Sequence, residues 1–195
     1  LLKEGEAVLQ GQPIFYSKGN PEIKFVSPVS GTLTTIERGA KRRIMSLSIA
    51  ADGNDNAVAQ KLEKLDKLEA TDVKKYLLES GCWPFVKQRP YDVIADPNST
   101  PKAIFISGFN TAPLAADVPF ILSSQKENFQ NGIDVLAKLA PKVHLSVDAS
   151  SVSFFNEVSN AEVHRFKGPH PAGNVGVQIH HIDPVNAGET VWVVG

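Results

Sequence analysis

Cysteine is almost absent from this sequence: among 195 residues the one cysteine is Cys82. A single thiol cannot form a disulfide within the chain, and it can hold neither an iron–sulfur cluster nor a cysteine-rich zinc site. A chain of this length buries roughly 70% of its extended surface on folding, so a hydrophobic core can form without such links. Cys82 itself fits the role of a small buried hydrophobic residue.

A surplus of charge of one sign is also lacking. Lys and Arg number 20 against 21 Asp and Glu, and the formal net charge is −1. Nonspecific nucleic-acid binding needs a basic surplus that neutralises phosphates, so we expect no nucleic-acid partner. Compact apolar runs such as residues 119–122 and 191–194 are far shorter than the ~18 residues needed to cross a bilayer. The sequence therefore predicts no membrane span.

The common glycine-rich phosphate motifs are missing as well. No G-x-G-x-x-G follows the first strand expected in the C-terminal part, and no G-x-x-x-x-G-K-[ST] occurs in the chain. These motifs supply the backbone N–H groups that bind pyrophosphate. The loose glycine spacing at residues 173–176 indicates a turn. Nothing in these motifs identifies a nucleotide site.

The first fifty residues predict a small all-β domain, which we place at residues 1–53. Five short β-rich runs are separated by Gly, Pro and Asn, and they lie at residues 7–9, 14–16, 24–26, 32–36 and 44–49. Strands that are so short and so often interrupted by turns are typical of a small sandwich or barrel.

Residues 54–70 are predicted to be a linker and a helix. The composition changes at residues 52–56, which are rich in turn formers, and leucines then recur at helical spacing among charged residues: Leu62, Leu65 and Leu68. Thr71 is expected to cap a further helix and Gly81 to end it.

Residues 71–195 predict a Rossmann-like α/β domain with a parallel sheet. Strands are expected at residues 103–107, 143–147 and 161–166. An amphipathic helix between the first two should bury one side, made of Ile121, Leu122, Phe129, Ile133, Leu136, Ala137 and Ala140. Short connections between strand, helix and strand imply a right-handed crossover, and hence parallel strands.

Ligands bind at the carboxyl ends of parallel strands, so the loops that follow the strands are candidate sites. Three such loops are residues 107–111, 148–151 and 167–173. A fourth segment, residues 82–91, combines three aromatic rings with two cations and suits stacking on a flat quinoid ring. The alternative is that these rings fill the space between the two domains.

Three histidines lie close together in sequence, namely His170, His180 and His181. Three imidazoles can form a metal site. If the segment is extended, however, adjacent residues point to opposite faces, so His180 and His181 cannot bind one metal. We therefore expect surface or hydrogen-bonded histidines and no metal site.

The N-terminal residues resemble the barrel-sandwich hybrid of biotinyl and lipoyl carrier domains, in residues 3–15 and 25–33. Those carriers modify a lysine at a hairpin tip. The corresponding tip here, residues 18–22, lacks the flanking Met-Lys-Met or Asp-Lys pattern. A carrier role is therefore the last of the three functions that we consider for this chain. It would predict a covalent modification on Lys18 or Lys24.

Several longer segments occur in an order that resembles one family. They are residues 79–85, 110–117, 166–173, 180–185 and 190–192. Together they are similar to the A subunit of the bacterial sodium-translocating NADH:quinone reductases, and the similarity covers essentially the whole chain. Because the chain begins without Met, we expect a middle fragment of such a protein. The resemblance also implies kinship with the C subunit of the Rnf complex and with the flavoprotein subunit of complex I.

The resemblance implies a peripheral subunit on the cytoplasmic side of the bacterial inner membrane. The whole complex would oxidise NADH with flavins, reduce ubiquinone and export sodium, and its other subunits would be the partners. The flavoprotein relatives carry a glycine-rich flavin loop where this chain has residues 79–85. Cys82 and Trp83 add side chains where backbone should approach a phosphate. We therefore expect no flavin or NADH on this fragment; the alternative is a redox domain that retains its cofactor.

Our interpretation is a scaffold subunit that contacts ubiquinone and has no catalytic residue or metal ligand of its own. Catalysis by this fragment alone is not expected. Three candidate quinone contacts are rings that would stack on the quinone: Trp83, Phe85 and Tyr91. Arg89 would donate a hydrogen bond to a quinone carbonyl. Two further candidates are Phe109 and His170.

Overall fold

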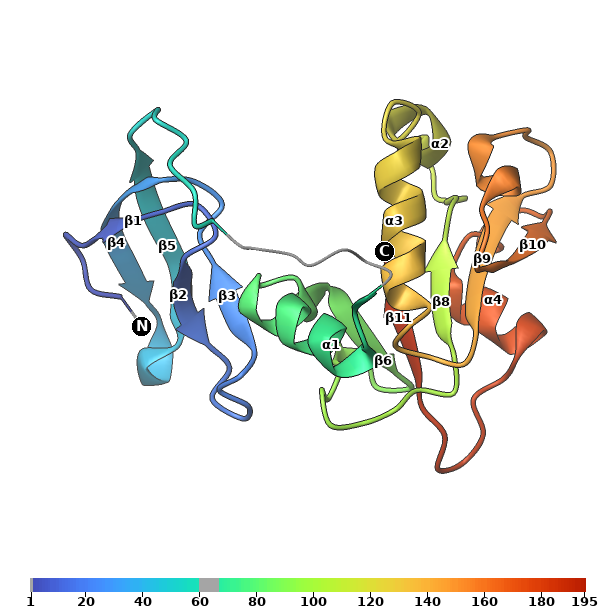
Figure 1. The fold of residues 1–195 in the computed structure, drawn as a ribbon, viewed down its shortest axis with the longest axis horizontal. Coiled ribbons are helices and arrows are strands. Elements are labelled where there is room, and N and C mark those ends of the chain that lie inside the picture. Colours follow the sequence, from blue (N-terminus) through green and yellow to red (C-terminus); the bar gives the residue numbers. More distant parts are fainter. Residues whose placement is uncertain (1, 60–66) are drawn as a thin grey trace. The chain divides into compact units, whose positions relative to one another are not determined.

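The computed structural model describes residues 2–59 and 67–195 (Figure 1). The chain divides into two compact units. The first consists of Leu1–Glu63 with Lys75–Pro84, and the second of Lys64–Lys74 with Phe85–Gly195. Two of the three helically spaced leucines, Leu62 and Leu65, lie outside the described residues. Leu68 is buried.

The first unit is built from two small antiparallel sheets. Its elements are β1 Ala7–Val8, β2 Pro13–Tyr16, β3 Lys24–Val26, β4 Gly31–Arg38, the 3-10 turn η1 Ala40–Arg42 and β5 Ile44–Ala51. One sheet has the order β1-β4-β5, and β2 pairs with β3. All five predicted strands are confirmed. The core side chains come from both sheets and the loops between them: Val8, Ile14, Ile23 and Leu33.

Two contacts explain the local sequence of this unit. Phe15 and Phe25 face each other across the β2–β3 pair, with ring centroids 4.5 Å apart and planes 11° from parallel. At the start of β4, a β-carbon on Gly31 would lie 2.0 Å from the Ala50 carbonyl oxygen. Because that contact is with backbone, only glycine fits at residue 31.

Helix α1 spans Ala70–Glu79. It begins before Thr71, so the prediction that Thr71 caps it is wrong. At the start of α1, the backbone N–H of Glu69 instead donates a hydrogen bond to the Asp72 carboxylate at 3.1 Å. Gly81 follows the helix with φ +73°, and a β-carbon there would lie 2.5 Å from the Val26 side chain. The role of Gly81 in ending α1 is confirmed.

The second unit contains a six-stranded mixed sheet. Its strands are β6 Val86–Arg89, β7 Val93–Ile94, β8 Ile104–Ser107, β9 Val143–Asp148, β10 Glu162–Phe166 and β11 Val191–Val194. The order is β10-β9-β8-β11-β6-β7. The neighbouring strands β10, β9, β8 and β11 are parallel to one another. Strand β6 pairs antiparallel with both β11 and β7.

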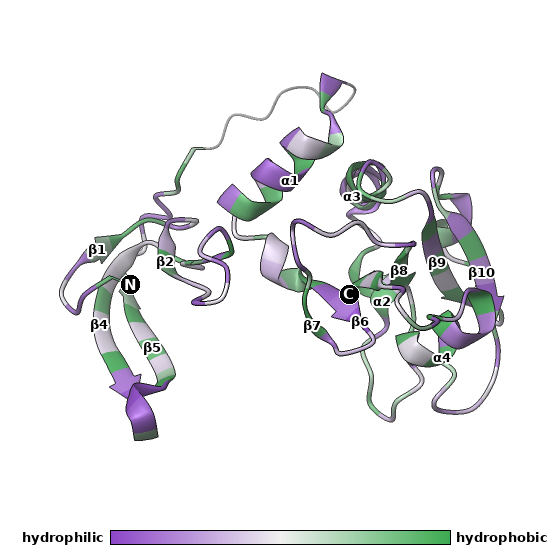
Figure 2. Ribbon diagram, turned by 90° about the horizontal axis from the view of Figure 1, so that it is seen from below, coloured by the Kyte–Doolittle hydropathy of each residue, from purple (hydrophilic) through white to green (hydrophobic). Residues whose placement is uncertain are grey.

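The three predicted strands are therefore confirmed, but the wholly parallel sheet is wrong. The β6–β7 pair was missed because β6 is mostly polar: Figure 2 colours it hydrophilic, and its last three residues are Lys87, Gln88 and Arg89. The turn at residues 90–92 reverses the chain in three residues, too few for the crossover that a parallel pair requires.

Helical elements of the described residues that follow β8 accompany this sheet: α2 Val118–Ile121, α3 Lys126–Leu136, the 3-10 turn η4 Phe154–Glu157 and α4 Val175–Ile182. Figure 2 shows α3 and α4 on opposite faces of the sheet. On the α4 side, Ile179 packs with Phe105 and Val191 in a buried cluster. None of the helices in the described ranges, 2–59 and 67–195, is long and apolar enough to cross a bilayer.

The predicted single amphipathic helix is two helices. Asp117 caps α2 by accepting the Phe120 N–H at 3.0 Å, and α3 starts only at Lys126. Ile133 on α3 is buried as expected, but Ile121 is 59% exposed. The prediction failed because the residues between the two helices, 122–125, turn the chain, so side chains on either side of the break do not share one face.

Candidate functional site

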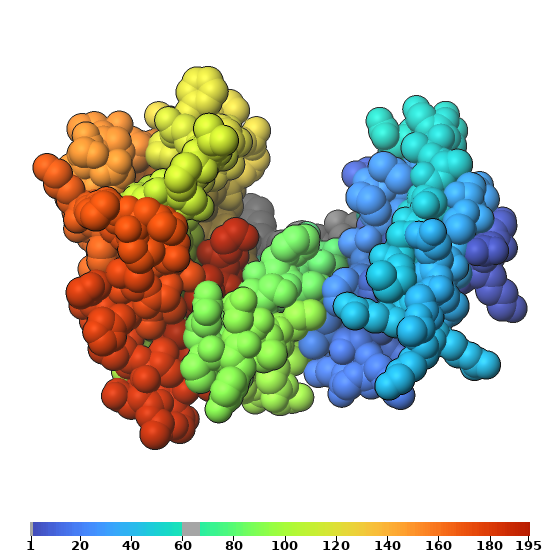
Figure 3. Space-filling view, turned by 180° about the vertical axis from the view of Figure 1, so that it is seen from behind, coloured from blue at the N-terminus to red at the C-terminus, as the bar shows by residue number. Residues whose placement is uncertain are grey.

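An open cavity of about 600 Å³ lies at the carboxyl ends of β8 and β9. The loop after β8 contributes Phe109 and Asn110, and the end of β9 contributes Asp148. The α2 segment and η4 form the remaining walls; in Figure 3 the α2 segment (yellow) stands beside the segment near residue 150 (orange). The position is the one at which α/β sheets bind their ligands.

Three aromatic side chains, Phe109, Phe120 and Phe154, line the cavity among smaller apolar and polar residues. Phe109 is nearly buried, at 9% exposure. Phe154 belongs to a cluster with Phe129 and Phe155, in which the three ring centroids are 4.4–5.7 Å apart. At the rim, Phe120 and Val152 are 77% and 96% exposed. A ligand would therefore meet apolar surface both inside the cavity and at its mouth.

Few charged groups line the cavity. The Lys126 ammonium lies 5.8 Å from the centroid of the Phe154 ring. Asp148 accepts hydrogen bonds from the Ser150 hydroxyl at 2.6 Å and the Ser150 N–H at 2.8 Å. These hydrogen bonds hold the pKa of Asp148 below its ordinary value. With Asp117, the cavity thus has two carboxylates against one ammonium, which disfavours anionic phosphate groups.

The loop after β8 is fixed by hydrogen bonds from several directions. Ser107 Oγ donates to the Phe109 carbonyl at 2.8 Å and accepts from the buried Gln178 side chain at 3.0 Å. Asn110 Oδ1 accepts the Ala112 N–H at 2.9 Å. The Asn110 amide nitrogen makes no hydrogen bond within the described part of the chain, which leaves it as a donor for a ligand.

The six predicted quinone contacts do not gather at one place. Phe109 lines the cavity, and His170 Nδ1 lies 3.3 Å from the Thr111 hydroxyl, two residues farther along the same loop. Trp83, in the 3-10 turn η3 Trp83–Phe85, is fully buried and presents no ring face to solvent. Its neighbour Cys82 is exposed, so the interpretation of Cys82 as a small buried hydrophobic residue is wrong.

The other three predicted contacts are accessible. Phe85 and Tyr91 are 67% and 83% exposed. Arg89 Nε lies 3.4 Å from Asp92 Oδ1, and Arg89 lines a second, smaller cavity of about 250 Å³ beside α4.

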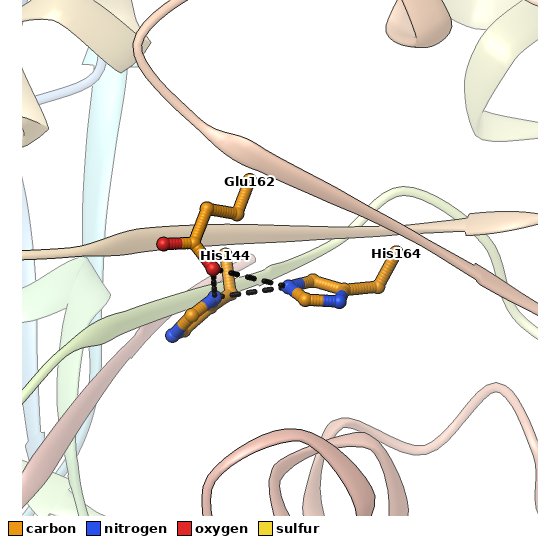
Figure 4. Close-up of side chains that lie close together, drawn as sticks. All are labelled: His144, Glu162 and His164. Carbon is orange, nitrogen blue, oxygen red and sulfur yellow. Dashed lines mark hydrogen bonds and ion pairs between the residues drawn. The ribbon is translucent and has the colours of Figure 1, made fainter.

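The segment that holds His180 and His181 is helical, so the prediction of opposite faces on a strand does not apply to it. The two rings lie 5.5 Å apart on α4. The histidines that do converge with a carboxylate are different ones: His144 on β9, and His164 with Glu162 on β10 (Figure 4).

The cluster of His144, Glu162 and His164 was not predicted from the sequence. His144 Nδ1 is 3.0 Å from His164 Nε2 and 3.5 Å from Glu162 Oε2, and the last two atoms are 3.9 Å apart. Burial lowers the pKa of His144, and the Glu162 carboxylate opposes that shift. The available signal was the Glu-x-His spacing, which places both side chains on one face of a strand. The pairing with His144 required the register of β9 and β10.

Comparison with known protein families gives two matches. Residues 1–52 match the model of the NqrA N-terminal barrel-sandwich hybrid domain. Residues 68–195 match the model of the NqrA second alpha/beta domain.

Relatives among curated proteins agree with these matches. The chain is 40% identical over 196 residues to the A subunit of the Na(+)-translocating NADH-quinone reductase of Neisseria gonorrhoeae (strain NCCP11945), covering 99% of this chain and 44% of that protein. It is 40% identical over 200 residues to the protein of the same name from Photorhabdus laumondii, covering 100% and 44%. The corresponding Haemophilus influenzae (strain PittGG) protein is 38% identical over 195 residues, covering 98% and 44%. The chain thus spans less than half the length of these relatives.

Proposed function

The chain belongs to the NqrA family, and from this premise we propose that it is the quinone-contacting and scaffolding part of one subunit of a sodium-exporting NADH:ubiquinone reductase. The names of its relatives support a place in such a complex. The subunit is peripheral, lies on the cytoplasmic side of the bacterial inner membrane and docks on the other subunits. NADH and the flavins are bound elsewhere in the complex.

The cavity at the ends of β8 and β9 carries the proposal that quinone binds this chain. Its volume, about 600 Å³, falls within the range of pockets for small organic ligands. A quinone is a flat ring with two carbonyl acceptors and an apolar tail. Phe109 and Phe154 supply ring faces, while the Asn110 amide and the Lys126 ammonium supply donors. The exposed apolar rim suits the tail.

The same cavity is poorly suited to a flavin or a dinucleotide. Asp117 and Asp148 place negative charge where a pyrophosphate would lie. The flavin loop of the flavoprotein relatives corresponds to residues 79–85, which here lie at and just after the C-terminal end of α1. A helix C-terminus presents carbonyl groups and repels anions. The parallel strands β8–β10, with helices on both faces, support a Rossmann-like scaffold without its phosphate site.

A second surface, made of Phe85, Arg89 and Tyr91, is the alternative place for quinone because the sequence predicts these residues as quinone contacts. Arg89 lies between Phe85 and Tyr91 in sequence, and both of these rings are exposed. Trp83 is buried, so we do not propose it as a direct contact to quinone. The two surfaces are separate within the second unit, so one labelling experiment distinguishes them.

Photo-crosslinking with an azido-ubiquinone probe in the intact complex tests the proposal. Peptide mapping should find the label on residues 109–126 or 148–154. Label on residues 85–91 instead would move the site to the second surface. Label confined to other subunits, and competed by unlabelled quinone, would refute quinone contact by this chain.

A further inference from the structure

We propose that His144, Glu162 and His164 form a binding site for a divalent cation of the zinc class (Figure 4). The site lies at the β9–β10 pair of the second unit, and none of its residues lines the cavity described above. It is therefore independent of quinone binding.

The three donor atoms have the spacing of metal ligands. They form a triangle with sides of 3.0, 3.5 and 3.9 Å. The point equidistant from the three corners lies about 2.0 Å from each atom, which is the length of Zn–N and Zn–O bonds. A cation at or just off the plane of this triangle would reach all three donors without displacement of the backbone.

The sheet fixes the positions of these side chains. In the parallel β9–β10 ladder, His144 is paired with Glu162, and His164 lies two residues farther along the same face. The His144 ring is 2% exposed and packs against Phe105, with centroids 4.8 Å apart. Phe105 in turn belongs to the buried cluster with Ile179. The ligand with the least freedom is thus held by the core, as preorganised sites require.

The donor set selects the class of cation. Mg²⁺ and Ca²⁺ prefer oxygen ligands, whereas two imidazoles and one carboxylate form a set that zinc uses in proteins. Burial lowers the pKa of His144, which favours the neutral imidazole that binds metals. Its other nitrogen, Nε2, has no hydrogen-bond partner within the described ranges, so nothing there prevents Nδ1 from acting as the ligand.

A hydrogen bond between the two histidines explains only one side of the triangle. One proton shared by His144 Nδ1 and His164 Nε2 accounts for their 3.0 Å contact. It does not account for the Glu162 oxygen, which lies near both nitrogens but beyond the usual hydrogen-bond length from each. A cation satisfies all three donors together. Because Glu162 is 56% exposed, a fourth position remains open to water.

Cobalt titration of the full-length protein provides the test, because tetrahedral Co²⁺ has visible absorption bands and zinc displaces it. We expect one Co²⁺ per chain. His164→Gln and Glu162→Gln should each weaken binding at least about tenfold, since even loss of a residue that only supports a ligand costs that much. His180→Gln is the matched control, because His180 is exposed on α4 and is not in the triangle.

Both substitutions replace the more exposed ligands, His164 and Glu162, and leave the buried His144 in place so that the protein still folds. Circular dichroism of the metal-free proteins checks that the variants are folded. Absence of saturable Co²⁺ binding to the wild type would overturn the proposal. So would equal affinity of the wild type and both folded ligand variants. Quinone affinity is not part of the readout, so failure here leaves the proposed function untouched.

Discussion

Gly173 and Thr111 approach so closely that a β-carbon on residue 173 would lie 2.5 Å from the Thr111 backbone nitrogen. The Gly173 N–H also donates to Thr111 Oγ1 at 2.9 Å. This contact joins the loop after β10 to the loop after β8, which carries Phe109 and Asn110 into the cavity wall. The position of the wall therefore depends on a residue that does not line it.

Substitution of this glycine should destabilise the second unit. Gly173→Ala forces the two loops apart and should lower the free energy of unfolding by about 1–3 kcal/mol, the usual cost of overpacking. Urea denaturation of the full-length protein measures it. Gly132→Ala is the control, since Gly132 lies in α3 with nothing within 4 Å and alanine should stabilise the helix by about 0.5–1 kcal/mol. A stabilised Gly173→Ala variant would contradict the close contact.

Loss of the Lys126 ammonium should weaken quinone binding. Lys126→Met removes a donor from the cavity while it retains length and helix propensity, so affinity for a short-chain ubiquinone analogue should fall about three- to tenfold. Lys75→Met, on the surface of α1, should bind like the wild type. If Lys126→Met also binds like the wild type, the ammonium is not a donor. A loss seen only in Arg89→Met would favour the second surface.

An ionic network around Lys102 should make stability depend on acid pH. Lys102 Nζ lies 2.6 Å from Asp183 and 3.0 Å from Glu189. Hydrogen bonds from the Asn186 N–H and from Lys102 lower the pKa of Glu189. The stabilisation that follows is fully present above the ordinary Glu pKa of 4.5 and is lost as pH falls through the lowered folded value.

The measurement for this network is urea denaturation from about pH 7 to pH 2, which spans the carboxylate range. The wild type should lose more stability than Lys102→Met over the acid part of this range, because part of the Glu189 shift depends on Lys102. In a separate alkaline series, the raised pKa of Lys102 predicts that the contribution of its ammonium group disappears only above the ordinary Lys value of 10.5. Parallel acid profiles of the two proteins would exclude the coupling.

Zinc should stabilise the second unit if it links β10 to β9. At a free concentration about 100 times Kd, one bound cation adds about 2.7 kcal/mol to the free energy of unfolding. Thermal denaturation with and without Zn²⁺ detects this, and EDTA should reverse it. The shift should vanish in Glu162→Gln and persist in His180→Gln. An identical shift in both variants would indicate binding elsewhere.

Purified full-length protein should carry no flavin, because the cavity offers two carboxylates and no glycine-rich cradle to a pyrophosphate. A visible absorption spectrum of the native protein and of the supernatant after heat denaturation checks this directly. A stoichiometric flavin spectrum would instead favour a redox domain that has kept its cofactor.

Much of the fold could be predicted from short-range signals. The strands of the first unit are separated by Gly, Pro and Asn, β8 is almost continuously apolar, and β9 alternates apolar with polar residues, so these patterns are visible in sequence. The family was visible in the same way, and the domain matches confirm it. The polar strand β6 escaped because Lys87, Gln88 and Arg89 do not alternate with apolar residues. The break between α2 and α3 escaped because apolar residues continue at helical spacing on both sides of it.

The candidate sites depended on longer-range information. The sequence by itself determined that ligands should meet the loops after the parallel strands, because carboxyl ends of such strands share one edge. It also determined that Phe109 and Asp148 lie at or just after the carboxyl ends of such strands. Only the tertiary structure decided that Trp83 is buried and that His144 faces Glu162 and His164. Burial and strand register join residues far apart in the chain, and a slip of one residue would turn each side chain to the opposite face.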